Sequence, residues 1–395
     1  MNGPRVLIAG ASIAGPALAH WLARYGAEVT VVERAPALRP GGQAVDARGV
    51  AREVIRRMGL DEQVRAARTE TAGARMVDED GTVLETFSAE DDGGDGFIAD
   101  IEILRGDFSR VLHDATADRV EYVFGDRITA LTQDADGVDV SFEHGEERRF
   151  ELVVGADGLR SSLRALAFGP HERYLHHLGQ TMAFYTAPNE FGLDRWLIDC
   201  TTPGRTAGLR PIRDATLGMA LFSFASPEPD RDAGRRDVVA QKRLLRERMQ
   251  GMGWLTPRIL EHLDAADDFY LDEVAQVVMD TWSTGRVVLL GDAAFCSSPM
   301  SGQGTSLALV GAYVLAGELA AARWNPGPAF AEYERLLRPM VDANQQVARW
   351  NAASRVVPAP GEEPPTSPAE WDMAVIERAI NGIDLPDYSA ANSHG

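Results

Sequence analysis

Short apolar runs separated by glycines divide the beginning of the chain into alternating strands and a helix. Residues 5–9 read Arg-Val-Leu-Ile-Ala, and a continuous apolar run of this length is typical of a strand buried on both faces. The glycine-containing stretch 10–15 comes next, and residues 16–25 then form a predicted helix that Gly26 ends. A second apolar run occupies residues 28–32. The pattern therefore predicts a βαβ unit at the start of the chain.

Beyond this unit, buried-strand segments alternate along the chain with segments of period two, which are typical of antiparallel strands. Residues 74–104 are expected to hold a hairpin and a mobile acidic loop (Glu90–Gly96), followed by a helix at 107–117 and strands in 120–154. Antiparallel strands are expected in 178–225, then a helix at 237–249 and a buried strand at 287–290. The rest of the chain is expected to contain helices at 305–322 and 329–354, a proline-rich linker at 357–368, a last helix at 370–380 and frayed final residues. The predicted fold class is α/β: a discontinuous Rossmann-like lobe with an inserted, mainly antiparallel sheet lobe and C-terminal helices.

The interleaving sets the predicted domain boundaries. We assign residues 1–73, 104–177 and 283–325 to the cofactor lobe, and residues 74–103 and 178–282 to the inserted substrate lobe. Residues 326–395 form the C-terminal helices and tail. A length of 395 residues accommodates two closely packed lobes.

The overall charge of the chain narrows the range of partners. Thirty-nine basic and 59 acidic residues give 39 − 59 = −20, and a surface this acidic repels phosphate backbones, so nucleic acid is not an expected partner. The two cysteines, Cys200 and Cys296, form no CxxC pair, so we expect no zinc site and a reducing cytoplasm. We expect no signal peptide before the first strand and no membrane span, because apolar runs such as 306–315 are too short for one.

The turn after the first strand resembles the dinucleotide fingerprint GxGxxG and reads Gly10-Ala11-Ser12-Ile13-Ala14-Gly15. In that fingerprint the first glycine makes a tight turn and the last lets the helix approach the strand, while Ser12 replaces the middle glycine. The helix N-terminus then offers free N–H groups to a pyrophosphate. Glu33 follows Gly15 by 18 residues, and an acid there accepts hydrogen bonds from a ribose 2′-hydroxyl but repels a 2′-phosphate. The site is therefore predicted to bind FAD or NAD rather than NADP.

Two further motifs follow predicted buried strands. Asp157-Gly158 comes after one of them, and taken alone it is as readily a type I turn. Gly291-Asp292 comes after the strand 287–290, and a carboxylate at a buried strand end needs a donor such as a sugar hydroxyl, although a helix cap is the alternative. Downstream, Gly302 and Gly304 open a helix whose amide dipoles point toward an electron-rich ligand.

Together these motifs resemble the single-component FAD-dependent aromatic hydroxylases, the family typified by para-hydroxybenzoate hydroxylase, over most of residues 4–345. The resemblance implies that Glu33 holds the adenosine ribose, that Arg105 contacts FAD and that Asp292 binds the ribityl chain. It also associates the Asp157 motif with both FAD and NAD(P)H. The predicted cofactor-binding set is Gly10, Ser12, Ile13, Ala14, Gly15, Glu33, Arg34, Asp46, Arg105, Asp157, Gly291, Asp292, Pro299, Gly302, Gly304 and Thr305.

Within that family the chain is most similar to the tetracycline-inactivating monooxygenases, on the segment Arg39-Pro40-Gly41-Gly42-Gln43-Ala44-Val45-Asp46. This likeness implies that Asp46 contacts FAD and that Arg39 helps to hold NAD(P)H. Two positions depart from the family pattern, because Ser12 stands where glycine is frequent and Ser306 stands where asparagine is frequent.

The antiparallel segment supplies candidates for a flat apolar pocket, which large ring substrates need. We predict substrate contacts from Phe184, Phe222 and Phe224. Arg195 and Arg210 are candidates for holding a phenolate or enolate, with a surface position as the alternative. His176 and His177 are adjacent on a strand and point to opposite faces, so we expect no metal site there.

The resemblance implies an FAD-dependent, NAD(P)H-consuming monooxygenase that transfers one oxygen atom of O₂ to an aromatic or polycyclic phenol or enol through a flavin C4a-hydroperoxide. The flavin performs the chemistry, so no catalytic side chain is assigned. A dehydrogenase or reductase without oxygen insertion, and a flavin-binding protein without turnover, stay open as alternatives. Residues 254–257 match the sequence pattern of flavin-dependent halogenases only in part, and Lys242 is the only lysine in the chain, so a halogenase is not the expected class. A monomer or homodimer is expected.

Overall fold

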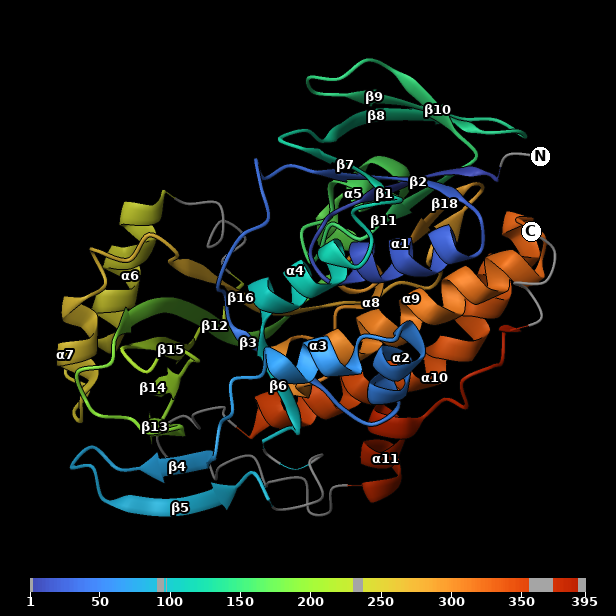
Figure 1. Ribbon diagram of the computed structural model, residues 1–395. Helices are drawn as coiled ribbons and strands as arrows, with labels where there is room; N and C mark the ends of the chain where they lie inside the picture. Colours follow the sequence, from blue (N-terminus) through green and yellow to red (C-terminus); the bar gives the residue numbers. More distant parts are fainter. Residues whose placement is uncertain (1–2, 91–95, 97, 230–236, 355–371, 390–395) are drawn as a thin grey trace.

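The computed structural model describes residues 3–90, 96, 98–229, 237–354 and 372–389 (Figure 1). The predicted linker at 357–368 and the final residues 390–395, which were predicted to fray, lie outside the described residues, and so do residues 91–95 of the predicted acidic loop.

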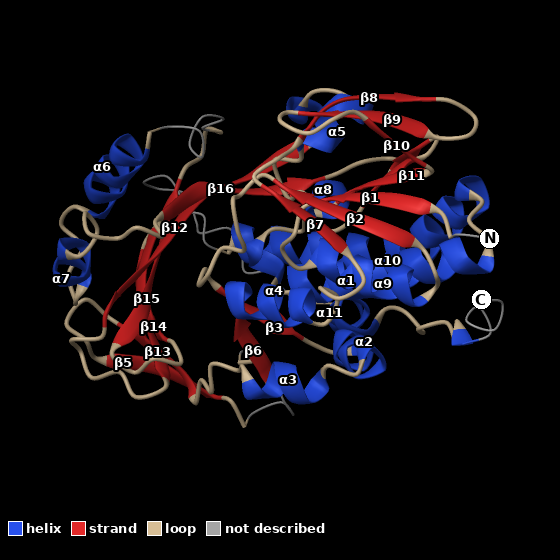
Figure 2. Cartoon of the chain, turned by 45° about the horizontal axis from the view of Figure 1, so that its top comes forward, coloured by secondary structure: helices blue, strands red, loops and turns tan. Residues whose placement is uncertain are grey.

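A six-stranded sheet organises the cofactor lobe, with the strand order β17-β18-β11-β1-β2-β7. Its strands are β1 (Arg5–Ala9), β2 (Glu28–Glu33), β7 (Glu121–Phe124), β11 (Leu152–Gly155), β17 (Ser283–Thr284) and β18 (Val287–Leu289). β1 pairs in parallel with β2 and β11, and the central residues of these strands are buried, as continuous apolar runs predict. Figure 2 shows the sheet between helices α1, α9 and α10 on one side and a small three-stranded sheet on the other. That sheet contains β8 (Ile128–Gln133), β9 (Val138–Phe142) and β10 (Arg148–Phe150).

Helices of this part of the chain pack mainly against the sheet and against one another. They are α1 (Ala14–Arg24), α2 (Val50–Met58), α3 (Asp61–Ala66), α4 (Arg105–Asp114), α5 (Ser162–Phe168), α8 (Asp292–Phe295), α9 (Gly304–Ala321), α10 (Pro326–Ala353) and α11 (Met373–Asn381). α1 begins two residues before the predicted start, and Pro16 still lies in its first turn, where the missing N–H costs nothing. α9 is long and apolar enough to cross a membrane, but most of it is buried inside the protein, as expected of a core helix.

A seven-stranded sheet forms the second lobe, in the order β16-β12-β15-β14-β13-β4-β5. Its strands are β4 (Gly73–Val77), β5 (Val83–Ser88), β12 (Leu175–Pro188), β13 (Trp196–Thr202), β14 (Arg205–Pro211), β15 (Leu217–Ala225) and β16 (Tyr270–Val277). All neighbouring strands are antiparallel except β13 and β4. Helices α6 (Val238–Met249) and α7 (Thr256–Glu261) cover its outer face (Figure 1), while a two-stranded ribbon of β3 (Ala44–Ala47) and β6 (Ile101–Leu104) lies between the lobes (Figure 2). The exact domain boundaries stay a prediction.

The alternation of side chains across this sheet corrects the predicted substrate pocket. Phe222 pairs with Ala183 across β12 and β15, and both lie in the core beneath α6 and α7 together with Phe224. Phe222 and Phe224 are therefore buried on the outer side of the sheet, away from the cofactor lobe. Phe184 pairs with Leu221 on the opposite face, because successive residues of a strand alternate in direction.

Candidate active site

Two glycines of the fingerprint turn occupy positions where the neighbouring backbone leaves no space for a side chain. Gly10 has φ +107°, and a Cβ atom there would lie 2.4 Å from the carbonyl oxygen of Ala156 on the segment after β11. A Cβ on Gly15 would lie 1.9 Å from the carbonyl oxygen of Gly10. Glycine at both positions thus lets α1 start directly over the end of β1, as the fingerprint requires.

The carboxylate of Glu33 ties the turn to the end of β2. It accepts hydrogen bonds from the backbone N–H of Ala11 at 3.0 Å and from that of Ala35 at 2.9 Å. A carboxylate has about four acceptor positions, so two remain for hydroxyl groups of a ribose.

Arg105 lies on the other side of the same turn. Its Nη1 donates to Ser12 Oγ at 3.2 Å, and its backbone N–H donates to the carbonyl of Gln43 at 3.0 Å. Burial and the nearby cation Arg39 lower the pKa of Arg105. Two guanidinium groups held this close to a helix N-terminus suit a diphosphate between or beside them.

A small pocket brings these elements together. It is lined by Ala11, Ser12, Glu33, Ala35, Ala37, Leu38, Arg39, Arg105 and Ser109. Four residues that the sequence predicted from separate segments, Ser12, Glu33, Arg39 and Arg105, therefore share one site. Arg34 is exposed, and Ile13 and Ala14 lie at the start of α1.

Asp292 marks the second part of the site, where the chain leaves β18. Gly291 turns the backbone with φ +64°, and α8 starts at Asp292. Burial raises the pKa of the Asp292 carboxyl, with the thiol of Cys296 acting in the opposite direction, yet the side chain stays accessible. An accessible carboxyl group enclosed by protein is expected in a ligand cleft, and it fits the hydroxyl groups of a ribityl chain.

The start of α9 lies beside Asp292. A short 3₁₀ turn (Pro299–Ser301) leads into Gly302, which has a left-handed φ of +67°, and a Cβ on Gly304 would lie 3.8 Å from Asp292 Oδ1. Thr305 is buried in the first turn of α9. Next to it, the hydroxyl of Ser306 accepts a hydrogen bond from the backbone N–H of Arg48 at 3.1 Å, which connects α9 to the end of β3. The serine at this position thus has a structural partner.

The Asp157 motif is associated with FAD and NAD(P)H by resemblance, and this role stays a prediction. Its carboxylate accepts hydrogen bonds from the hydroxyls of Ser161 and Ser162 and from the backbone N–H of Leu163. These bonds organise the start of α5. The backbone of Ala156 and Asp157 packs against Gly10, so the motif shapes the glycine turn while its carboxylate is occupied within the chain.

The side of the site that faces the second sheet is charged. Asp46 is an ion-pair partner of Arg48 at 2.9 Å and lies opposite Glu102 in the ribbon of β3 and β6. Glu102 in turn pairs with Arg210 of β14 at 2.9 Å. Arg210 therefore lies between the lobes and not on the surface, which was the alternative.

The two remaining substrate candidates, Phe184 and Arg195, differ in how far they are exposed. Phe184 is buried and stacks on Tyr270 with ring centroids 5.4 Å apart and nearly parallel planes. Arg195 takes the surface position that was its alternative: its side chain is 61% exposed just before β13, beside Asp194. Sequence reasoning missed Tyr270, Arg48 and Glu102.

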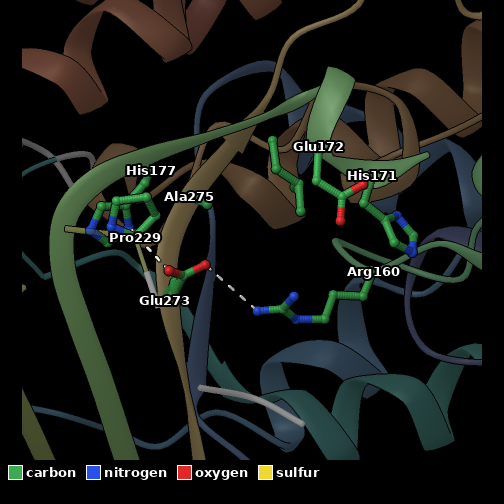
Figure 3. A pocket seen from close by; sticks show the side chains of 8 residues that line it. Arg160, His171, Glu172, His177, Pro229, Glu273 and Ala275 are labelled. Carbon is green, nitrogen blue, oxygen red and sulfur yellow. Dashed lines mark ion pairs between the residues drawn. The ribbon is translucent and has the colours of Figure 1, made fainter. Parts of the chain in front are cut away.

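A cavity of about 100 Å³ lies at the edge of β12 and β16 (Figure 3). Figure 3 shows Glu273 between Arg160 and His177. The carboxylate oxygens of Glu273 lie 3.8 Å from Nη2 of Arg160 and 3.8 Å from Nδ1 of His177. Arg160 makes its closest ion pair with Asp272 of β16, which joins the segment after β11 to the second sheet. Among the described residues, no group of three or more acidic, histidine or cysteine side chains is placed to hold a metal ion.

The fold and the site define an FAD-binding oxidoreductase: a Rossmann-like βαβ unit, an acid at the end of β2, and a second acid beside the start of α9. The model of the FAD binding domain family matches residues 4–343, and the chain belongs to that family. It is 43% identical to an uncharacterized protein of Mycobacterium tuberculosis, over 97% of this chain and 99% of that protein. It is 38% identical to a flavin-dependent monooxygenase of Legionella longbeachae, over 98% of this chain and 99% of that enzyme.

Solved structures agree with this assignment. The tetracycline destructase Tet(51) superposes with a TM-score of 0.85 at 35% identity, over 98% of this chain and 100% of that chain. Klebsiella pneumoniae HpxO in complex with FAD and uric acid shares the fold, with a TM-score of 0.70 at 21% identity over 100% of this chain and 94% of that chain. The protein is a flavin-dependent monooxygenase with FAD as its cofactor, as the sequence predicted.

Proposed function

We propose that this enzyme consumes NAD(P)H and O₂ to oxygenate a polycyclic phenol or enol, which it binds as the anion. The observation that carries the proposal is Arg210, a largely buried cation on the face of the second sheet that is turned toward the cofactor lobe. The chain is 35% identical to tetracycline destructase Tet(51) over nearly its whole length, and this similarity supports a substrate with fused rings.

We assign the binding of the cofactor to residues of the first lobe. Glu33 would accept the ribose hydroxyls, Arg105 would neutralise the diphosphate, and Asp292 would accept the ribityl hydroxyls. The N-terminus of α9 supplies N–H groups for an electron-rich ring edge. When FAD is bound, it supplies the electron transfer and the activation of oxygen. The protein then has to bind the substrate, orient it toward the cofactor and exclude water.

The second sheet supplies the substrate side. The stacked rings of Phe184 and Tyr270 offer a flat apolar surface. Met219 lies opposite Arg210 in β14 and β15, and Leu221 lies opposite Phe184 in β12 and β15. A flat aromatic ligand with one ionised oxygen would satisfy both the apolar surface and the cation.

The test uses the purified flavinated enzyme. NADPH oxidation, O₂ uptake and product mass are followed with a tetracycline and with a panel of hydroxyanthraquinones. Substrate-stimulated NADPH oxidation, with O₂ consumed and a product heavier by one oxygen, is expected. Product formed without O₂ uptake would instead establish the dehydrogenase or reductase alternative for this reaction. A cytoplasmic location and a monomer or homodimer remain parts of the proposal.

Arg39 provides a separate prediction about the reductant. Its side chain is exposed at the rim of the dinucleotide pocket, where a co-substrate that must dissociate has access. Arg39→Ala is expected to raise the KM for NAD(P)H roughly tenfold, which corresponds to one lost contact between a cation and a phosphate. FAD content should stay intact, because Arg105 keeps its bond to Ser12.

Steady-state kinetics with varied NAD(P)H measures this effect. Arg243→Ala is the matched control, because Arg243 is 74% exposed on α6, on the outer face of the second sheet. Loss of FAD from the Arg39 variant with an unchanged KM would move Arg39 from the reductant to the FAD diphosphate.

A further inference from the structure

Glu102 is a charged residue inside an apolar strand. β6 reads Ile-Glu-Ile-Leu, all four residues are buried, and Glu102 is 4% exposed. A buried carboxylate is costly unless hydrogen bonds and a cation compensate it. An acid inside this short apolar run is the signal that sequence reasoning could have used.

Each oxygen of this carboxylate has a defined partner. Oε1 accepts hydrogen bonds from the hydroxyls of Thr69 and Thr71, at 2.6 and 2.5 Å. Oε2 accepts from Nη1 of Arg210 at 2.9 Å. Burial by itself opposes ionisation, but Arg210 and the two threonines hold the pKa of Glu102 below its usual value. The carboxylate is therefore a fixed anion that the segment after α3 anchors.

The bond from Glu102 uses only one edge of the guanidinium. Nε of Arg210 is buried and has no hydrogen-bond partner among the described residues. A guanidinium presents its five N–H donors in a rigid planar fork, so holding Nη1 also fixes the direction of Nε–H. A buried donor without a partner is destabilising unless a ligand supplies the acceptor.

The residues around Arg210 connect its Nε–H donor to both parts of the site, the flavin side and the substrate sheet. Arg210 pairs with Met219 across β14 and β15, on the face of the sheet that α6 and α7 do not cover. Glu102 lies opposite Asp46, and the next residues along β3 lead to Arg48, whose N–H is bonded to Ser306 at the start of α9. The Glu102–Arg210 pair thus connects the flavin side of the site to the substrate sheet.

We propose that Glu102 is a positioning residue that holds Arg210 so that its free Nε–H is directed to a negatively charged oxygen of the substrate. The inference rests on the proposed function and narrows it to substrates that bind as phenolates or enolates. A buried ion pair contributes little stability compared with apolar side chains of similar volume, so stability alone does not account for it. Orientation of a donor that the substrate needs does account for it.

Removing the charge of Glu102 should release Arg210. In Glu102→Gln the amide NH₂ replaces one carboxylate oxygen, and the guanidinium then turns to other acids that already act on it, Asp46 and Asp199. Oδ1 of Asp46 is buried without a hydrogen-bond partner among the described residues and is available for that contact. Arg210 is then neutralised away from the substrate.

The experiment measures binding without turnover. 2-Hydroxyanthraquinone and its O-methyl ether are titrated into the oxidised holoenzyme, and the change in the flavin spectrum gives Kd above and below the pKa of the phenol. The wild type is expected to bind the ionised phenol at least tenfold more tightly than the ether. Glu102→Gln should lose that preference, with a Kd for the anion raised tenfold or more and FAD content unchanged.

A double-mutant cycle tests whether Glu102 acts through Arg210. Arg210→Gln should weaken anion binding as much as Glu102→Gln does, and the double variant should be no worse than Arg210→Gln alone. Losses that add would overturn the proposal. Thr71→Val removes one hydrogen-bond donor to the same carboxylate and should give a smaller loss of anion binding. It replaces Glu102→Gln as the test variant if Glu102→Gln does not retain FAD.

The matched control is Glu334→Gln. Glu334 and Arg338 form a partly buried ion pair on α10, with side chains 19% and 31% exposed, and Glu334 also accepts a hydrogen bond from the backbone N–H of Trp282, away from the substrate sheet. Its Kd for the anion should stay within twofold of wild type. An equal loss in this control would show general loosening of the protein and overturn the proposal. If the wild type oxygenates a substrate but shows no preference for the ionised form, the inference fails while the proposed function stands. If it consumes no O₂ with any phenol, the proposed function fails.

Discussion

Replacing Asp292 with alanine is expected to yield a folded protein that purifies without FAD. The carboxyl group lies at the end of the central sheet beside the first turn of α9, accessible but enclosed. Hydrogen bonds to a charged acceptor contribute about 1.5–3 kcal/mol each, so losing the contacts to the ribityl hydroxyls should weaken FAD about 100-fold. The ratio of absorbance near 450 nm to that at 280 nm, followed by titration with FAD, measures the loss.

Stability of the FAD-free protein distinguishes a binding role from a structural one. Burial raises the pKa of Asp292, so this carboxyl group is held at a cost in the absence of a ligand. The FAD-free Asp292→Ala protein should therefore unfold at the same temperature as FAD-free wild type or higher. Glu33→Gln should retain more FAD, because an amide oxygen still accepts one of the two backbone bonds. A fully flavinated Asp292→Ala protein would remove Asp292 from the site.

The parts of the fold that the sequence predicts well are those set by local pattern. The apolar runs of β1, β2 and β18 are buried on both faces and need no knowledge of their partners to be recognised as strands. The glycine turn and the acid at the end of β2 are likewise recognised from the local sequence, and the structure brings Ser12, Glu33 and Arg105 together.

The substrate side could not be predicted in the same way, because it depends on which face of a sheet meets the cofactor lobe. Alternation in β15 indicates that Phe222 and Phe224 share a face, but not that α6 and α7 cover it. The charge pair likewise joins Glu102 and Arg210, which are 108 residues apart in the chain. Asp157 illustrates the opposite case, because a motif that the sequence associates with cofactors uses its carboxylate locally, at the start of α5, the helix that follows it.

Gly15→Ala is expected to have the largest effect on stability among single-methyl additions to the fingerprint turn. The new Cβ would lie 1.9 Å from the carbonyl oxygen of Gly10 and 3.3 Å from Cγ2 of Ile8. The first contact is with backbone, so no side-chain rotation relieves it, and α1 has to move away from the end of β1. Overpacking typically costs 1–3 kcal/mol, and we expect about 3 kcal/mol here. Urea unfolding of the FAD-free protein measures the change.

The same movement would displace the N–H groups that face the diphosphate, so FAD affinity should fall together with stability. Gly327→Ala is the matched control: Gly327 lies in the first turn of α10, and its nearest neighbour, Asn325 Oδ1, would be 3.9 Å from the new Cβ. Alanine there should be neutral or slightly stabilising, because it reduces the freedom of the unfolded chain without a clash. If Gly15→Ala unfolds like wild type and keeps its FAD, the close approach of α1 to β1 is not what positions the cofactor. Loss of both properties in Gly15→Ala alone would show that this single backbone contact couples the fold of the βαβ unit to the binding of FAD.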